Sequence, residues 1–488
     1  MNDQSSPGFP IQTPSKSHWL ENLPPSLLKL RDYQSSPKLP ATVLDVCIIG
    51  SGMTGASVAY HLNQTNTNLS IAVLEGRGLC SGATGRNGGF LHAHSFNQWW
   101  PLYEKYGIFK ATTLVLLEQA GRNAIHKIAY DESFECDMDK NVKLAMLFPK
   151  HEDLQKKLGK FHAFRHNLLS VFGVNSIDTK EECAKIFNLD SMRSDKKIES
   201  AIVINKGCDT FWPAKFVLEI FSRLIERDVH VQTNTMVTKV TQREEDGLYV
   251  VETTRGVVLT KNVVHATNAW IGSLVPDLKD VIKPVLNTVV STEPTTTPPL
   301  LNEENRRTGM DLQPGYHYWH SRKDGRIILG GFRNSRTDRG VDVWKDGEAS
   351  KKDIQTAENF LYNLGFFKAL TTNKIQIERA WTGIIGWSMD GMPWVGALSD
   401  VGTRTKKKKG LVDSGREYVA AGFSGHGMTQ TWLCGKEIAT MITSNGGGIP
   451  MLLPTKNRIM TAQKKGGDWL EYEKAKEKKT AKRVVAKS

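Results

Sequence analysis

A set of three glycines between two hydrophobic runs constrains this chain more than any other feature. Residues 43–49 are rich in β-branched side chains and predict a buried strand of a parallel sheet. After the glycines, the apolar spacing of 56–62 predicts a helix, and 71–74 predict a second strand that ends at Glu75. This order of strand, glycine turn, helix, strand and acid predicts a Rossmann-type dinucleotide-binding unit with a GxGxxG turn formed by Gly50, Gly52 and Gly55.

Each element of this unit has an expected role. The first glycine makes the tight turn, the second lets the backbone approach a pyrophosphate at the helix N-terminus, and the third lets helix and strand pack closely. Glu75 would accept hydrogen bonds from ribose hydroxyls and repel a 2′-phosphate, so NADP is disfavoured while NAD and FAD both remain. The expected contacts are Gly50, Ser51, Gly52, Met53, Thr54, Gly55, Glu75 and Gly76.

A glycine-rich run, EGRGLCSGATGRNGGF, begins at Glu75, and we call its residues 76–89 the glycine loop. Such a run is either a linker or backbone that presses against a ligand, because glycine loses much freedom on ordering. Its place after the ribose acid resembles the second flavin-binding stretch of FAD-dependent oxidoreductases of the D-amino-acid oxidase superfamily. The resemblance implies FAD contacts along the loop at Arg77, Ser81, Thr84, Gly85, Arg86, Asn87, Gly88 and Gly89.

Two more segments are similar to that superfamily. Residues 229–240 and 256–270 look like the meander and returning strand of its FAD domain, and 418–442 look like its last flavin strand and helix. The resemblance implies that the backbone of Val237 contacts the adenine. The motif GATGRNGG is most similar to that of the γ-glutamylputrescine oxidoreductase branch. The resemblance implies non-covalent FAD, with further contacts at Ala266, Thr267, Asn268, Gly422, Phe423, Gly425, His426, Gly427 and Met428.

The resemblance also implies an α/β fold in which an FAD-binding Rossmann-type domain is interleaved with an antiparallel-sheet substrate domain. The expected division starts with an extended arm and ends with a basic tail. Its segments are 1–40 (arm), 41–105 (first FAD segment), 106–204 (first substrate segment), 205–275 (second FAD segment), 276–378 (second substrate segment), 379–447 (third FAD segment) and 448–488 (tail).

One hairpin is expected to carry substrate-facing residues. The segment YHYWH, RKDG and RIILGG at 316–331 predicts two strands joined by a turn, and alternation places Tyr316, Tyr318 and His320 on one face, opposite His317 and Trp319. In the superfamily this sheet forms a roof over the flavin. The expected catalytic residues are Tyr318, Arg333 and His426, with Trp381, Trp387 and His92 as further candidates. For any one of the aromatic residues, plain core packing is an equally good interpretation.

The sequence leaves the substrate open. The stretch TGIIGWSMDG at 382–391 has no arginine to grip an α-carboxylate, and Ile328 and Thr429 stand where sarcosine oxidases carry lysines. We expect oxidation of the C–N bond of a small amine or amino-acid derivative by hydride transfer to flavin N5, giving an imine that hydrolyses, with oxygen or another compound as electron acceptor. A hydroxy-acid or polyol oxidase, an FAD-dependent tRNA-modifying enzyme and a non-catalytic FAD-binding protein remain as alternatives.

The net charge of +13 is concentrated in two segments. Residues 451–488 carry eleven Lys and Arg against four Asp and Glu, and Arg404 with 406–409 adds five positive charges, so the rest is close to neutral. This pattern favours a solvated loop and tail over a nucleic-acid site. The sequence shows no membrane-length apolar run, no signal-peptide pattern and no metal or disulfide spacing among its six cysteines, so we expect a cytoplasmic enzyme without metal.

Overall fold

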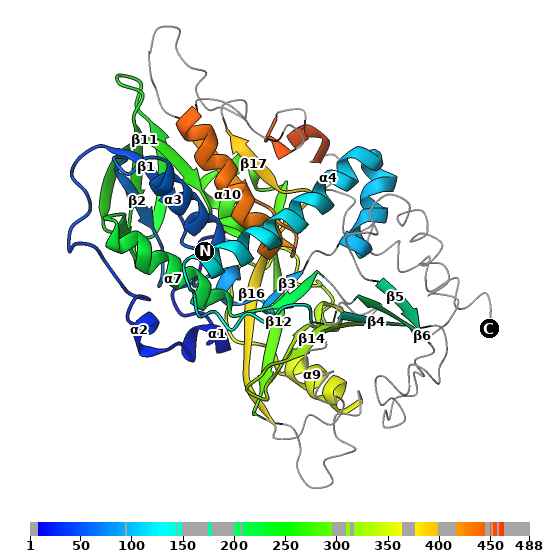
Figure 1. The fold of residues 1–488 in the computed structure, drawn as a ribbon. Coiled ribbons are helices and arrows are strands. Elements are labelled where there is room, and N and C mark those ends of the chain that lie inside the picture. Colours follow the sequence, from blue (N-terminus) through cyan, green and yellow to red (C-terminus); the bar gives the residue numbers. More distant parts are fainter. Residues whose placement is uncertain are drawn as a thin grey trace.

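The fold is built on two large sheets that the chain visits in turn (Figure 1). Tyr316, the basic loop at 404–409 and most of the expected tail lie outside the residues that this computed structural model describes. Those residues are 8–92, 95–142, 144–148, 174–177, 200–204, 207–294, 309–312, 317–363, 376–398, 416–444, 449, 452–455 and 458–462.

The first sheet contains the predicted dinucleotide-binding unit, which is confirmed. Strand β1 (Leu44–Ile49) pairs in parallel with β2 (Ile71–Leu74), and α3 (Met53–Thr65) connects them. On its other side β1 pairs in parallel with β11 (Gly256–His265), which places β1 inside an eight-stranded sheet. The expected meander and last flavin strand are also present, and the remaining strands are β8 (His230–Gln232), β9 (Val237–Gln242), β10 (Tyr249–Thr253), β17 (Trp394–Ala397) and β18 (Glu417–Ala421).

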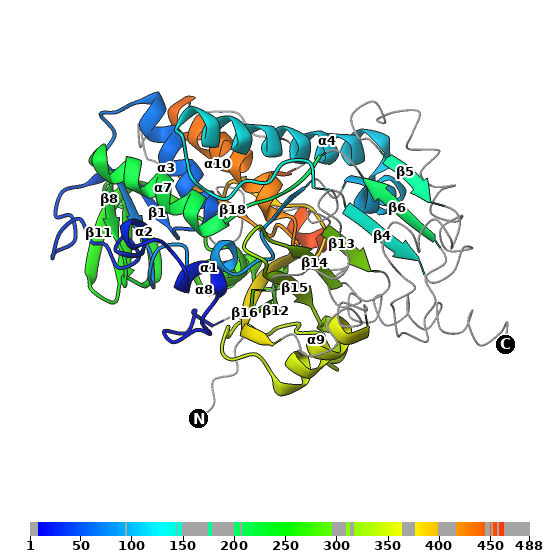
Figure 2. The same ribbon diagram turned by 60° about the horizontal axis from the view of Figure 1, so that its bottom comes forward.

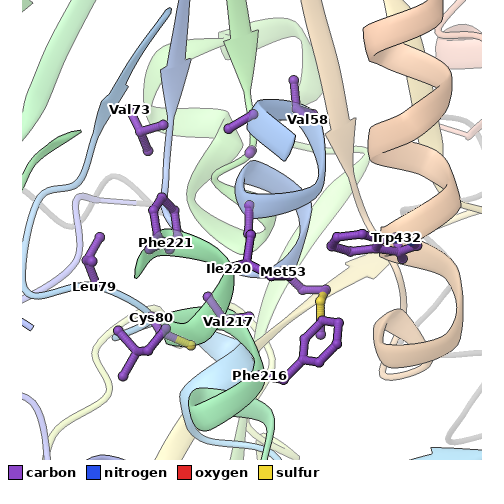
Figure 3. Close-up of a cluster of buried hydrophobic side chains, with 14 of the residues drawn as sticks. Met53, Val58, Val73, Leu79, Cys80, Phe216, Val217, Ile220, Phe221 and Trp432 are labelled. Carbon is purple, nitrogen blue, oxygen red and sulfur yellow. The ribbon is translucent and has the colours of Figure 1, made fainter. Parts of the chain in front are cut away.

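Both faces of the first sheet are covered, which explains its continuous hydrophobic strands. One face packs against α3, α7 (Pro213–Glu226) and α10 (Gly427–Ser444), where Phe216 and Trp432 lie beside Met53 (Figure 3). The opposite face packs against side chains of the meander, including Val251 and Val258.

The second sheet is antiparallel except where β13 pairs with β4. The predicted hairpin is confirmed as β14 (His317–Ser321) and β15 (Ile327–Gly331). Because the chain passes from the first sheet to the second and back twice, the predicted interleaved α/β fold is confirmed, although β16 crosses the expected boundary at 378. The other strands are β4 (Leu144–Phe148), β5 (Val174–Ile177), β6 (Ser200–Ile204), β12 (Ile282–Thr292), β13 (Gly309–Leu312) and β16 (Ile377–Ser388).

Helices and short segments complete the fold. Helix α9 (Lys351–Asn363) covers one face of the second sheet, and α4 (Ser95–Asp131), interrupted at Gly107, runs beside α10 (Figure 2). Within the described ranges, no helix combines the length and apolar character needed to cross a membrane. The shorter elements are α1 (His18–Glu21), α2 (Pro25–Leu28), η1 (Ala83–Gly85), β3 (Phe90–His92), β7 (Cys208–Thr210), η4 (Asn268–Trp270), α8 (Ile271–Leu274), η5 (Pro276–Leu278) and η7 (Arg333–Ser335).

A buried carboxylate joins the glycine loop to the second sheet. The side chain of Asp346 is fully buried and accepts two hydrogen bonds from Nη1 of Arg77, at 3.0 and 2.9 Å, while Nε of Arg86 lies 3.5 Å from it. Arg86 also donates to the backbone oxygens of Ser15 and Thr382, at 2.7 and 2.9 Å. Burial lowers the pKa of Arg86 to about 10, and the negative charge of Asp346 opposes that shift. This ion cluster therefore connects the N-terminal arm, the glycine loop and β16.

We expect Asp346→Asn to lower the free energy of unfolding by about 3–5 kcal/mol, because two buried guanidinium groups would lose their counter-ion. Chemical denaturation monitored by circular dichroism measures this change. The control Asp131→Asn removes an exposed pair with Lys127 and should cost about 0.5 kcal/mol or less. Equal effects of the two substitutions would contradict a structural role for the cluster.

Candidate active site

The three glycines of the GxGxxG turn meet different surroundings. Gly50 has a φ of +104°, and a Cβ there would lie 2.8 Å from the backbone oxygen of Ala266. A Cβ on Gly55 would overlap the backbone oxygen of Gly50, so the fold itself needs both glycines. At Gly52, by contrast, a Cβ would meet just one atom of the described chain within 4 Å, the hydroxyl oxygen of Thr84 at 3.2 Å. Gly52 therefore borders space beside the N-terminus of α3.

That space has the polar groups that a pyrophosphate needs. The first turn of α3, which contains Met53, Thr54 and Gly55, has no acidic side chain, so the positive end of the helix dipole stays available for an anion. The hydroxyl of Thr267, next to Gly50, is buried and has no hydrogen-bond partner within the described residues. A buried hydroxyl without a partner is unfavourable unless a ligand satisfies it, so this end of the site fits the pyrophosphate of a dinucleotide.

Glu75, the predicted ribose contact, accepts three hydrogen bonds from its own protein. Its Oε2 accepts hydrogen bonds from the backbone and hydroxyl of Ser51, at 3.0 and 2.6 Å, and its Oε1 accepts one from the backbone of Arg77 at 3.0 Å. A carboxylate has about four acceptor positions, so capacity remains for a ribose hydroxyl. Gly76 packs against Met236, which precedes Val237 at the start of β9, so these predicted contacts lie close together.

The three predicted flavin segments converge at their ends. The side chain of Asn87 donates to the backbone oxygen of Thr84 at 2.9 Å and contacts the sulfur of Met428, in the first turn of α10, at 3.2 Å. The backbone N–H of Gly422 donates to the side chain of Asn268 at 3.0 Å. Phe423, the residue after Gly422, is buried. A Cβ on Gly425 would meet no described atom within 4 Å, so there is open space just before α10 begins at Gly427.

The two arginines of the glycine loop face the interior of the protein. The ion cluster around Asp346 engages both guanidinium groups, and the backbone oxygen of Ser81 accepts hydrogen bonds from each of them, at 3.1 Å from Arg77 and 2.8 Å from Arg86. Contacts from Arg77 or Arg86 to a cofactor would therefore come from their backbones.

Tyr318 lies between the glycine loop and the second sheet. A Cβ on Gly88 or on Gly330 would overlap its ring, so both glycines make room for it. Asn287, on β12, donates to the Tyr318 hydroxyl at 3.1 Å. Burial raises the pKa of Tyr318 to about 12, so this hydroxyl stays protonated at neutral pH.

Neighbouring residues confirm the predicted alternation of β14. Nε2 of His320 lies 2.8 Å from the backbone oxygen of Gly88, and the ring of Phe90 packs edge-on against both Tyr318 and His320. His317 instead contacts Phe360 of α9, on the opposite face. We call the face with Tyr318 and His320 the inner face of the second sheet.

Arg333 and Trp387 also meet. The guanidinium carbon of Arg333 lies 4.9 Å from the centre of a Trp387 ring, and its Nε donates to the backbone oxygen of Arg339 at 3.2 Å. Trp381 is fully buried and donates its indole N–H to the backbone oxygen of Arg86 at 2.9 Å. Trp381 thus supports the glycine loop, whereas Arg333 and Trp387 form a cation–aromatic pair.

Two histidines complete the site: His92 is buried, and His426 is half-buried. Burial lowers the pKa of His426 to about 4. Burial, together with the neighbouring His426, lowers the pKa of His92 to about 3. Both rings are therefore neutral at pH 7.

Comparison with known proteins identifies the family. Residues 45–441 match the model of the family described as FAD dependent oxidoreductase. The chain belongs to this family. The predicted superfamily, its FAD cofactor and its oxidoreductase activity are therefore confirmed, and the residues around Gly52 and Thr267 would hold the pyrophosphate of FAD.

Relatives of this flavoenzyme support the same assignment. It is 25% identical over 408 residues to gamma-glutamylputrescine oxidoreductase of Escherichia coli, covering 82% of this chain and 83% of that protein. It is 23% identical over 434 residues to the probable oxidoreductase OrdL of Haemophilus influenzae, covering 84% and 86%. Both matches agree with the predicted branch.

Solved structures show the same fold. Glycine oxidase from Geobacillus kaustophilus superposes with a TM-score of 0.65 at 17% identity, covering 85% of this chain and 98% of that one. L-Amino acid deaminase from Proteus myxofaciens gives a TM-score of 0.65 at 13% identity, covering 92% and 98%.

Two residues of this flavoenzyme site are not among those predicted from the sequence. Asn287 stands in the buried apolar strand β12, where a lone amide is a signal that it meets a polar partner. Asp346 lies 269 residues from Arg77, and no local pattern indicates that pairing. Within the described ranges no group of three or more His, Cys, Asp or Glu side chains could hold a metal ion.

We expect Gly52→Val to give a folded but colourless protein, whereas the wild type purifies yellow and releases FAD on acid denaturation. A side chain at Gly52 would occupy the space beside α3 while touching little of the protein itself. Absorbance at the flavin bands and the thermal unfolding of the apoprotein measure the two properties. Gly55→Ala serves as the contrast, because its overlap with Gly50 should destabilise the fold; a yellow Gly52→Val protein would contradict the assigned pyrophosphate site.

We expect the free energy of unfolding to fall as the pH is lowered from about 6.5 to about 4. The unfolded chain binds protons in this window, whereas His320, with its pKa lowered to about 4 by burial, stays neutral in the folded protein. His320→Gln can still donate to Gly88, and its loss of stability over this range should be smaller by about 3 kcal/mol. Urea denaturation at pH 7 and pH 4 tests this, and equal losses in the two proteins would contradict it.

Proposed function

We propose that this flavoenzyme oxidises a C–N bond of an amine that lacks an α-carboxylate. When bound, FAD supplies a two-electron acceptor at N5, so that a hydride leaves the carbon next to nitrogen and water then hydrolyses the resulting imine to a carbonyl compound and an amine. The main support is the uncharged character of the groups between the glycine loop and the inner face: the Tyr318 hydroxyl is protonated, and His92 and His426 are neutral.

Such surroundings favour the reactive form of an amine. Removal from water lowers the pKa of an amine, so an ammonium substrate gives up its proton on entry and presents a nitrogen lone pair. The rings of Phe90 and Tyr318 pack edge to face on one side of this region, and the Tyr318 hydroxyl, which accepts a hydrogen bond from Asn287, offers a neutral hydrogen-bonding group. The reaction then depends on position and dryness, and no residue has to remove a proton from carbon.

Arg333 provides a positive charge for the polar end of the substrate. Its guanidinium lies against Trp387, so its direction is restricted. Residues 382–391, which form the second half of β16 and the turn after it, contain no arginine that could bind an α-carboxylate. The relative from Escherichia coli, by its name, acts on gamma-glutamylputrescine, a diamine with an acyl group that places a carboxylate far from the reacting amine. A distant carboxylate of this kind suits Arg333.

A panel of reductants tests the proposal. Anaerobic mixing with acylated diamines, D-alanine, sarcosine and 2-hydroxy acids is followed by bleaching of the flavin absorbance. We expect acylated diamines to reduce the flavin fastest. Fastest reduction by D-alanine, sarcosine or a 2-hydroxy acid would overturn the amine assignment, and reoxidation in air then separates an oxidase from a dehydrogenase.

We expect Arg333→Ala to raise the concentration of acylated diamine needed for half-maximal reduction by about tenfold to a hundredfold, because one charge-assisted hydrogen bond is lost. The limiting rate should change less, since the residue does not touch the reacting carbon. Arg336→Ala is the matched control: this nearby arginine binds Asp338 on the surface and should leave both values unchanged. Unchanged half-saturation in Arg333→Ala would show that the charge does not contact substrate.

A further inference from the structure

The geometry points to the N-terminal arm, residues 8–40, as a clasp that fixes the glycine loop in the conformation that binds FAD, with Ser17 and Trp19 as positioning residues. The arm precedes residue 45, where the match to the family begins. Its role therefore concerns this chain's own sequence outside the matched flavoenzyme segment. The inference rests on FAD binding and does not depend on which substrate is oxidised.

Four successive carbonyl groups of the glycine loop accept hydrogen bonds from side chains outside it. The arm supplies two of the donors and the second sheet supplies the other two. The pairs are Ser17 Oγ to Gly85 O at 2.6 Å, Trp381 Nε1 to Arg86 O at 2.9 Å, Trp19 Nε1 to Asn87 O at 2.6 Å and His320 Nε2 to Gly88 O at 2.8 Å. Each bond fixes the orientation of one peptide plane, so the direction of the whole loop is specified from outside.

The arm also packs against the loop. A Cβ on Gly89 would lie 2.8 Å from the Trp19 ring, and one on Gly85 would lie 2.8 Å from the Leu20 side chain. The arm thus lies in direct contact with the loop at both glycines, although the backbone oxygens of Cys80 and Phe211 also crowd Gly85 and Gly89. The N–H groups of Asn87 and Gly88 are among the loop's backbone donors that bond to no acceptor within the described residues, so they are available to a ligand.

Trp19 is anchored by contacts that do not involve FAD. Its side chain is fully buried, its backbone oxygen accepts the indole N–H of Trp212 at 2.8 Å, and the two rings meet edge to face at 5.4 Å. The guanidinium of Arg322 lies 5.2 Å from the Trp19 ring. Because all of these partners are protein groups, they hold Trp19 in place without any contact to the cofactor, and the arm can then order the loop independently of FAD.

A glycine loop that is already ordered before FAD binds has a higher affinity for FAD. A glycine-rich loop that was free in the apoprotein would lose its conformational entropy at the moment of binding, and the affinity for FAD would be lower by that amount. Loss of one arm donor also leaves a buried carbonyl without a partner, which makes the binding conformation less stable. The arm should therefore influence FAD affinity while touching no atom of the substrate.

Trp19→Phe and Ser17→Ala test the inference, because each removes one donor and keeps most of the side chain. We expect the dissociation constant for FAD, measured by titrating apoprotein and following flavin fluorescence, to rise by about fivefold to a hundredfold. Visible circular dichroism of the bound flavin should change, and hydrogen exchange of residues 85–89 in the apoprotein should become faster.

Ser57→Ala is the matched control. Ser57 is also fully buried and donates its hydroxyl to a backbone oxygen, that of Trp432, at 2.5 Å, but it does not contact the loop. It should destabilise the fold to a similar extent as Ser17→Ala and leave FAD affinity within twofold of the wild type. FAD affinity within twofold in Ser17→Ala and Trp19→Phe, or an equal loss in Ser57→Ala, would overturn the clasp. Since no substrate is present, either outcome is independent of the amine assignment.

Discussion

The close contact between the glycine loop and the inner face of the second sheet is the constraint on which the active site depends. The ring of Tyr318 fits between Gly88 and Gly330, and a methyl group at either position would overlap it. Closely packed interiors cannot absorb such an overlap without separating the layers. The glycine loop can therefore approach the second sheet this closely only because Gly88 and Gly330 leave room for the Tyr318 ring.

The same contact determines the electrostatic character of the site. Desolvation by the surrounding protein shifts the pKa of Tyr318, His92 and His426 toward the neutral form of each side chain. The charged groups nearby are paired instead with one another, as Arg77 is with Asp346. Neutral side chains around Tyr318 suit the binding of an amine as its neutral base, which is the form that the proposed reaction requires.

Much of the fold could be predicted from local sequence, because the decisive signals there are short-range. The strand, glycine turn and helix around Gly52 and the hairpin around Tyr318 each lie within about thirty residues, and both are present. Asp346 and Trp19 could not be assigned in this way, since their partners lie 269 and 68 residues away. The local sequence around Asp346 or Trp19 is compatible with many different partners, and only the packing of distant segments determines which partner each residue has.

The side chains that donate hydrogen bonds to the glycine loop come from three regions of the chain and therefore couple these regions. Ser17 and Trp19 belong to the arm, His320 to β14 and Trp381 to β16, so the loop has its full set of hydrogen bonds only when both the arm and the second sheet are in place. By linkage, a ligand that binds the ordered loop must also stabilise the docking of these regions. If FAD binds the ordered loop, as inferred above, FAD binding and docking of the arm and the second sheet form one cooperative process.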